Sequence, residues 1–92
     1  MKSNKPTLVD YLKTISDDNR LAILNALKNG SLCVCEIFLL LKIPQNLASH
    51  HLRVLKDCRL VESIREGTKI IYSRNEKGIE YYQKLLANTI QK

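Results

Sequence analysis

Apolar residues recur at helical spacing in the first third of the chain. The periodic positions are Leu8, Tyr11, Leu12 and Ile15 within residues 7–15, then Leu21, Leu24 and Leu27 within residues 16–30. Because these residues are three or four positions apart, each segment predicts an amphipathic helix. Pro6 suits the start of the first helix. In the second, Asp17 or Asp18 is the expected N-cap and Gly30 the left-handed stop.

The next two segments predict helices separated by a tight turn. Residues 35–42, CEIFLLLK, are apolar nearly all round, so we expect a short buried helix. A turn at residues 42–45 leads into a fourth helix over residues 45–58, with Leu47, Leu52 and Leu55 as apolar anchors. The polar face of this helix carries Gln45, Asn46, Ser49, His50 and Arg53.

Beyond residue 58 the period changes from helix to strand. Residues 60–66 and 68–74 are rich in β-branched side chains and flank Gly67, which predicts a hairpin. A last helix is expected over residues 76–91, and its apolar face comprises Ile79, Tyr82, Leu85, Leu86 and Ile90. The order is therefore α-α-α-α-β-β-α. With no linker or repeat, we expect a single domain over residues 1–92.

Two short helices joined by a tight turn and followed by a basic hairpin predict a winged helix-turn-helix. The fold class is thus mostly α with a small β-hairpin. In this arrangement the second helix enters the major groove of DNA, and the hairpin, or wing, lies along the backbone.

The charge distribution is consistent with a polyanion as partner. Fifteen Lys and Arg against nine Asp and Glu give a net charge of +6. Seven of the basic residues but only three of the acidic ones fall between residues 42 and 74. A solvated basic face is the alternative interpretation.

Amides, hydroxyls and imidazoles read base edges, whereas Lys and Arg contact phosphates without reading sequence. The candidates for base contacts are Gln45, Asn46, Ser49 and His50, and those for phosphate contacts are Arg53, Arg65, Lys69 and Arg74. A solvated surface side chain is the alternative for each residue taken singly.

The longest apolar run, residues 37–41, is far shorter than the roughly 18 residues that a membrane span needs. The N-terminal stretch MKSNKPT leads into no hydrophobic signal region. We therefore expect a cytoplasmic protein without a membrane partner. In a reducing compartment, three cysteines favour metal binding or burial over a disulfide framework.

Residues 12–75 resemble the ArsR/SmtB family of winged-helix metal-sensing repressors. The resemblance rests on SDDNRLAIL, LCVCEI, SHHLRVLKDC and REGTKIIY, in that order and spacing. It implies a homodimer that binds an inverted-repeat operator in double-stranded DNA and releases it when metal binds. Members pair through their first and last helices. The stripes available here are Leu8, Leu12 and Ile15 in the first, and Tyr82, Leu85, Leu86 and Ile90 in the last.

Within that family, the Cys33-Val34-Cys35 motif resembles the thiolate site that senses As(III) and Sb(III), and, with further ligands, Cd(II), Pb(II) or Zn(II). Thiolates select soft ions, and a helix N-terminus lowers a thiol pKa. We therefore expect Cys33 and Cys35 to bind As(III) or Sb(III), with Cd(II), Pb(II) and Zn(II) ranked lower. Residues two apart on a helix point about 200° apart, so one ion can bind both sulfurs only outside a regular helical turn.

Several positions depart from the family pattern. Phe38 stands where arsenite sensors often have a third cysteine, so the third ligand would be solvent, a small thiol or a partner residue. Arg59 stands where relatives commonly have the glycine that ends the recognition helix, and Pro44 replaces the usual Ser cap. We expect Cys58 and His51 to be structural.

Two functions remain open at this point, while an enzyme finds no support. The first is a repressor released by a metal or metalloid. The second is a repressor of the same family that does not sense metal and is redox-responsive or constitutive. Paired carboxylates, a nucleophile with a base and a glycine-rich phosphate loop are all missing from the sequence.

Overall fold

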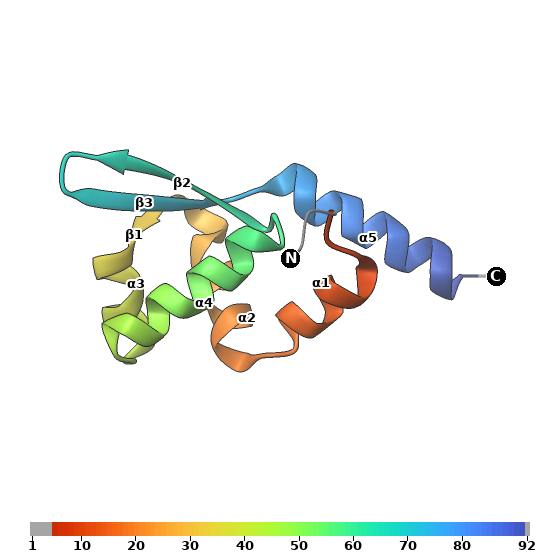
Figure 1. The fold of residues 1–92 in the computed structure, drawn as a ribbon, viewed down its shortest axis with the longest axis horizontal. Helices are drawn as coiled ribbons and strands as arrows, with labels where there is room; N and C mark the ends of the chain where they lie inside the picture. Colours follow the sequence, from red (N-terminus) through yellow and green to blue (C-terminus); the bar gives the residue numbers. More distant parts are fainter. Residues whose placement is uncertain (1–4, 92) are drawn as a thin grey trace.

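The computed structural model describes residues 5–91, so residues 1–4 of the MKSNKPT stretch lie outside the described part. The elements are α1 (Leu8–Ile15), α2 (Asp18–Ala26), the 3-10 turn η1 (Leu27–Asn29), β1 (Leu32–Cys33), α3 (Val34–Leu41), α4 (Gln45–Asp57), β2 (Val61–Glu66), β3 (Lys69–Arg74) and α5 (Glu76–Ile90). The predicted α-α-α-α-β-β-α order and the winged helix-turn-helix are confirmed. The short elements η1 and β1 were not expected. Figure 1 shows the β2–β3 hairpin and α5 extending in opposite directions from the helical body.

Local side-chain caps set the starts of the first two helices. The amide of Asp10 donates to Thr7 Oγ1 at 3.2 Å, and the amide of Thr7 donates to Asp10 Oδ2 at 2.9 Å. This reciprocal pair, rather than Pro6 alone, begins α1. Asp17 is the N-cap of α2 and accepts from the amides of Asn19 and Arg20. These backbone hydrogen bonds, that of Arg20 first, lower the pKa of Asp17.

The core lies where all five helices meet the base of the sheet. Its fully buried members include Ile23, Ile37, Leu52, Leu55, Leu60 and Val61. Tyr11 of α1 and Tyr82 of α5 stack with ring centroids 4.6 Å apart, which joins the two ends of the chain. Burial raises the pKa of Tyr82 further than any other cause, so its hydroxyl stays neutral.

Two expectations about burial were wrong. Leu21 of α2 is 48% exposed, and Ile23 takes its place in the core. Helix α3 is not buried all round, because Leu39 and Leu40 are 69% and 61% exposed and only Ile37 is buried. A helix on the surface of a small domain can turn only one face to the core, whatever its composition.

The sheet has the order β1-β3-β2 and is antiparallel throughout. Ser63 pairs with Tyr72 and Ile64 with Ile71, so these pairs lie on opposite faces. The ammonium of Lys56 donates to Ser63 Oγ at 2.8 Å, which turns the Ser63 face toward α4.

Among residues 5–91, two residues other than glycine adopt left-handed backbone conformations, Lys42 with φ 57° and Arg59 with φ 64°. Each costs about 1 kcal/mol relative to glycine. Arg59 thus makes the same turn that a glycine would make after α4. Its carbonyl accepts from Asn75 Nδ2 at 3.0 Å, and Gly78 packs against that carbonyl with no room for a Cβ.

Candidate DNA interface and cysteine pair

Helix α4 separates buried and polar residues onto opposite faces. Ala48, His51, Leu52 and Leu55 are buried against the body. The sequence-predicted contact residues of this helix, namely Gln45, Asn46, Ser49, His50 and Arg53, are all exposed. The whole candidate surface is therefore accessible, and its contact with DNA stays a prediction.

Pro44 begins α4 without shifting it. Its φ of −61° and ψ of 148° suit an N-cap, and its carbonyl accepts from the amides of Leu47 and Ala48 at 3.1 Å. Gln45 is consequently the first helical residue, as expected. The amides of the first turn have no side-chain cap, which leaves the positive end of α4 beside Gln45 and Asn46.

His51 is a structural residue under α4. Its Nδ1 accepts from Arg20 Nε at 3.1 Å and lies 4.0 Å from Asp17 Oδ1. Burial lowers the pKa of His51 despite the nearby Asp17 carboxylate. The neutral imidazole therefore links α4 to the start of α2 and holds the helix against the body.

The wing presents Arg65 and Lys69 close to its tip. Both are exposed; Arg65 is the last residue but one of β2, and Lys69 is the first residue of β3. Arg65 pairs with Ile70 and Lys69 with Glu66, so the two cations lie on opposite faces of the hairpin. Whichever face of the hairpin lay along DNA, one of these two side chains would be on that face.

Arg74 makes contacts within the fold, and the phosphate contact expected for it stays a prediction. Its Nε donates to Glu76 Oε2 at 2.7 Å, and its Nη1 donates to the carbonyl of Leu24 at 3.1 Å. The guanidinium thus joins the base of the wing to α2 and α5, and its hydrogen bonds lower the pKa of Glu76. We give Arg74 a structural role first, because its Nε, Nη1 and Nη2 each donate a hydrogen bond within the fold.

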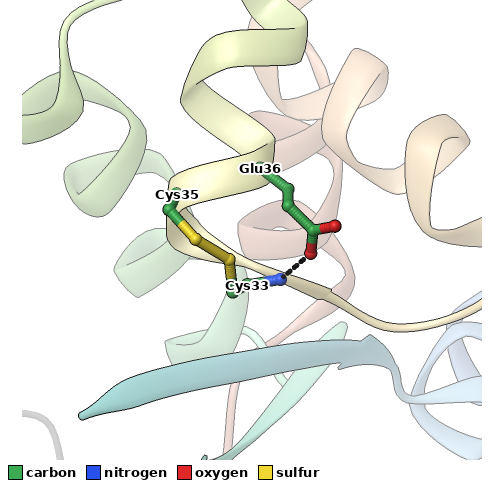
Figure 2. Close-up of a disulfide and its surroundings, with 3 residues drawn as sticks. All are labelled: Cys33, Cys35 and Glu36. Atoms are coloured by element: carbon green, nitrogen blue, oxygen red, sulfur yellow. Dashed lines mark hydrogen bonds between the residues drawn. A yellow bond between two sulfur atoms is a disulfide. The ribbon is translucent and has the colours of Figure 1, made fainter.

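Cys33 and Cys35 are joined by a disulfide at the start of α3 (Figure 2). The expectation that thiols would be favoured over a disulfide is therefore corrected for this structure. Cys33 is the N-cap, with an extended backbone at φ −82° and ψ 162°, and its amide donates to Glu36 Oε1 at 2.9 Å. Because Cys33 lies outside the helix, the two sulfurs meet while α3 stays intact. Unwinding is not required.

The reduced pair would offer two soft donors to an ion. Cys33 is buried and Cys35 exposed, so an ion would approach from the Cys35 side. Phe38 has no donor atom, and Cys58 lies in the core with its Sγ 3.9 Å from the hydroxyl of Tyr82. Residues 5–91 contain no group of three or more His, Cys, Asp or Glu side chains that could hold a metal ion. A third ligand would thus come from solvent, a small thiol or a partner molecule.

Cys33 also belongs to the sheet, a link that the sequence did not indicate. It pairs with Ile71 of β3, while Leu32 pairs with Tyr72. The cysteine pair therefore lies where the first helix of the helix-turn-helix meets the wing. A two-residue strand has too short a pattern to be recognised in a sequence.

The apolar surfaces of α1 and α5 differ from those expected. Tyr82 is a core residue, and Leu8, Ile15 and Leu85 pack against the core of their own chain. The large apolar side chains that α1 and α5 expose are Val9, Leu12, Tyr81 and Ile90. Of the predicted stripes, Leu12 and Ile90 are thus the exposed members. Within the described residues no helix is both long and apolar enough to cross a membrane.

Comparison with known proteins adds a family and several relatives. The model of the arsR family of bacterial regulatory proteins matches residues 17–63. The arsenical resistance operon repressor of Staphylococcus xylosus is 36% identical over 74 residues, covering 80% of this chain and 71% of that protein. A homolog of the cadmium resistance regulator CadC from Staphylococcus aureus is 32% identical over 80 residues, covering 86% of this chain and 66% of that protein. The SmtB repressor homolog of Synechocystis is 29% identical over 84 residues, and the chain spans 64% of its length.

A solved structure shows the same fold. The homodimeric winged helix-turn-helix DNA-binding domain of a possible ArsR-family regulator from Mycobacterium bovis superposes with a TM-score of 0.75 at 28% identity. The match covers 89% of this chain and 77% of the other.

Proposed function

The chain belongs to the arsR family of bacterial regulatory proteins, and we propose that it is a metal-responsive repressor. The family consists of transcriptional regulators, so the expectation that the protein is not an enzyme is confirmed. In our proposal a homodimer binds an inverted-repeat operator and releases it when Cys33 and Cys35, as thiolates, bind As(III) or Sb(III).

The position of the cysteine pair is the observation that carries this proposal. Cys33 is at once the N-cap of α3 and a partner of Ile71 in the sheet. An ion held by both sulfurs therefore acts on the helix-turn-helix and the wing together. Two thiolates suit a thiophilic ion, whereas a closed zinc site requires four ligands. The arsenical and cadmium regulators among the relatives support the choice of effector.

DNA binding is assigned to the exposed face of α4 and the tip of the wing. Gln45, Asn46, Ser49 and His50 would read bases, while Arg53, Arg65 and Lys69 would contact phosphates. Half-sites on an inverted repeat require two copies, and the exposed apolar residues of α1 and α5 are the proposed pairing surface. Ion binding and DNA binding must weaken each other equally, because the coupling is reciprocal.

A titration on DNA tests the effector. A fluorescent duplex selected from a random 30-bp library by the reduced protein is titrated with As(III), Sb(III), Cd(II) and Zn(II), and anisotropy reports release. We expect release by As(III) or Sb(III) at the lowest concentrations. The double variant with Cys33→Ser and Cys35→Ser should still bind DNA but should no longer release it when the metal or metalloid is added. The Cys58→Ala variant should release DNA as the wild type does. If the doubly substituted variant still responds, the cysteine pair is not the sensor.

The disulfide favours a second candidate, a repressor that responds to oxidation. Here two thiols lose two electrons and two protons to an oxidant such as oxidised glutathione, and the bridge forms. The same anisotropy experiment without metal separates the candidates. Release on oxidation, reversed by a reductant and absent from the Cys35→Ser variant, supports redox control. Unchanged binding of the oxidised protein excludes it.

A further inference from the structure

The turn of the helix-turn-helix contains a lysine in an unfavourable backbone conformation. Lys42 ends α3 with φ 57° and ψ 46°, and its amide hydrogen-bonds to the carbonyl of Leu39 at 3.3 Å. The amide of Ile43 donates to the carbonyl of Phe38 at 3.2 Å and closes the turn. Glycine is favoured at such a position because it has no Cβ. The backbone of this turn does not require a lysine, so the side chain calls for another explanation.

The charge of Lys42 is isolated within the DNA-binding motif. From residue 29 to residue 52 it is the only Lys or Arg. It is exposed, and among the described residues its ammonium makes no hydrogen bond or ion pair. Its neighbours Leu39 and Leu40 are exposed and apolar, so they offer nothing to a polyanion.

The position of Lys42 suits a phosphate. In a helix-turn-helix the first helix crosses the DNA backbone while the second lies in the major groove. Lys42 ends the first of these helices, α3, and stands three residues before Gln45, where α4 begins. A backbone phosphate at this point would meet the lysine ammonium together with the positive end of α4.

We propose that Lys42 binds a phosphate of the DNA backbone at the α3–α4 turn and fixes how deeply α4 enters the groove. The inference rests on the DNA-binding function proposed above. Since Lys42 touches no base, it contributes to affinity on every sequence alike.

Arg59 provides a matched control within the same chain. It has the same left-handed conformation, is also exposed and carries the same charge. It follows the opposite end of α4, whose 13 residues are about 20 Å long. Lys42→Gly and Arg59→Gly therefore remove the same backbone strain and the same charge at two different places.

The experiment measures binding to the selected duplex between 50 and 300 mM salt, together with thermal melting. The plot of log K against log salt has a negative slope, and each lost phosphate contact reduces its magnitude by about 0.9. Near 0.15 M salt this corresponds to an affinity that is about fivefold weaker. For Lys42→Gly in a dimer on two half-sites we expect a loss of about 25-fold, with Tm raised by about 4 °C. Arg59→Gly should raise Tm similarly and keep the wild-type salt slope, and Lys42→Arg should bind as the wild type does.

A Lys42→Gly variant with a higher Tm and a lower affinity for DNA supports the proposal, because damage to the fold would lower both Tm and affinity. A wild-type salt slope in Lys42→Gly overturns it, and so does an equal loss in Arg59→Gly, which would show a general effect of net charge. If the wild-type protein itself binds duplex DNA without salt dependence, the proposed function fails and this inference fails with it.

Discussion

Arg74 allows a direct test of whether a basic residue on the wing supports the fold or binds DNA. Arg74→Ala removes the hydrogen bond to the Leu24 carbonyl, which joins β3 to α2, and the ion pair with Glu76 at the start of α5. Arg65→Ala is the comparison, since Arg65 is exposed near the tip of the same hairpin.

The expected loss of stability follows from the Leu24 contact. A hydrogen bond from a charged donor contributes about 1.5–3 kcal/mol, and this one is partly buried. The Glu76 carboxylate is solvent-exposed and adds little. For a domain of this size each kcal/mol corresponds to about 4–8 °C, so a loss of about 2 kcal/mol lowers Tm by about 8–16 °C.

Circular dichroism melts and salt-dependent binding to the selected duplex provide the two measurements. Arg74→Ala should lower Tm and, well below that Tm, keep the wild-type salt slope. Arg65→Ala should keep Tm and reduce the slope by about 0.9 for each half-site. Glu76→Gln isolates the ion pair and should change Tm only slightly. An Arg74→Ala protein with unchanged Tm and a reduced slope would refute the structural role and restore the DNA contact first predicted.

Three further outcomes test the packing. Gly78→Ala should lower Tm by several degrees in a thermal melt, because a Cβ at this position collides with the Arg59 carbonyl. The clash should outweigh a gain in helix propensity of about 1 kcal/mol, and a more stable variant would contradict this. Stability should fall as pH drops from 7.5 to 5.5, because burial lowers the pKa of His51 below its unfolded value near 6.5. In this range the unfolded chain binds more protons than the folded chain. In the His51→Gln variant, Tm should therefore depend less on pH. Ile37→Ala should cost about 2–5 kcal/mol in denaturant unfolding and Leu39→Glu almost nothing, whereas equal losses would mean that α3 is buried all round.

Periodicity and caps were enough to predict the order of the elements, an N-cap at Asp17 or Asp18 and the helix-turn-helix, because these depend on residues close in sequence. The errors arose where distant residues decide. Leu39 is apolar, yet its exposure depends on how far the other helices reach around α3. Tyr82 has the same spacing as a dimer stripe, but Tyr11 covers it within the chain.

The features of the candidate site likewise divide into those that nearby residues determine and those that distant residues determine. The exposed face of α4 follows from its own pattern of apolar anchors. The engagement of Arg74 depends on the Leu24 carbonyl, fifty positions away, and no local pattern reports it. Cys33 could meet Cys35 only because it adopts an extended backbone and pairs with Ile71, far along the chain.

The disulfide spans only two positions of the chain. A ring this small restricts the unfolded chain by about 1.6 kcal/mol on the chain-entropy scale, against about 4.7 kcal/mol for a bridge across 100 residues. Opening or closing it therefore changes the lifetime of the protein against proteolysis far less than a domain-spanning bridge would. If the protein is the redox-responsive repressor proposed as the second candidate, a cell would change its state by opening or closing this bridge while the number of copies stays constant.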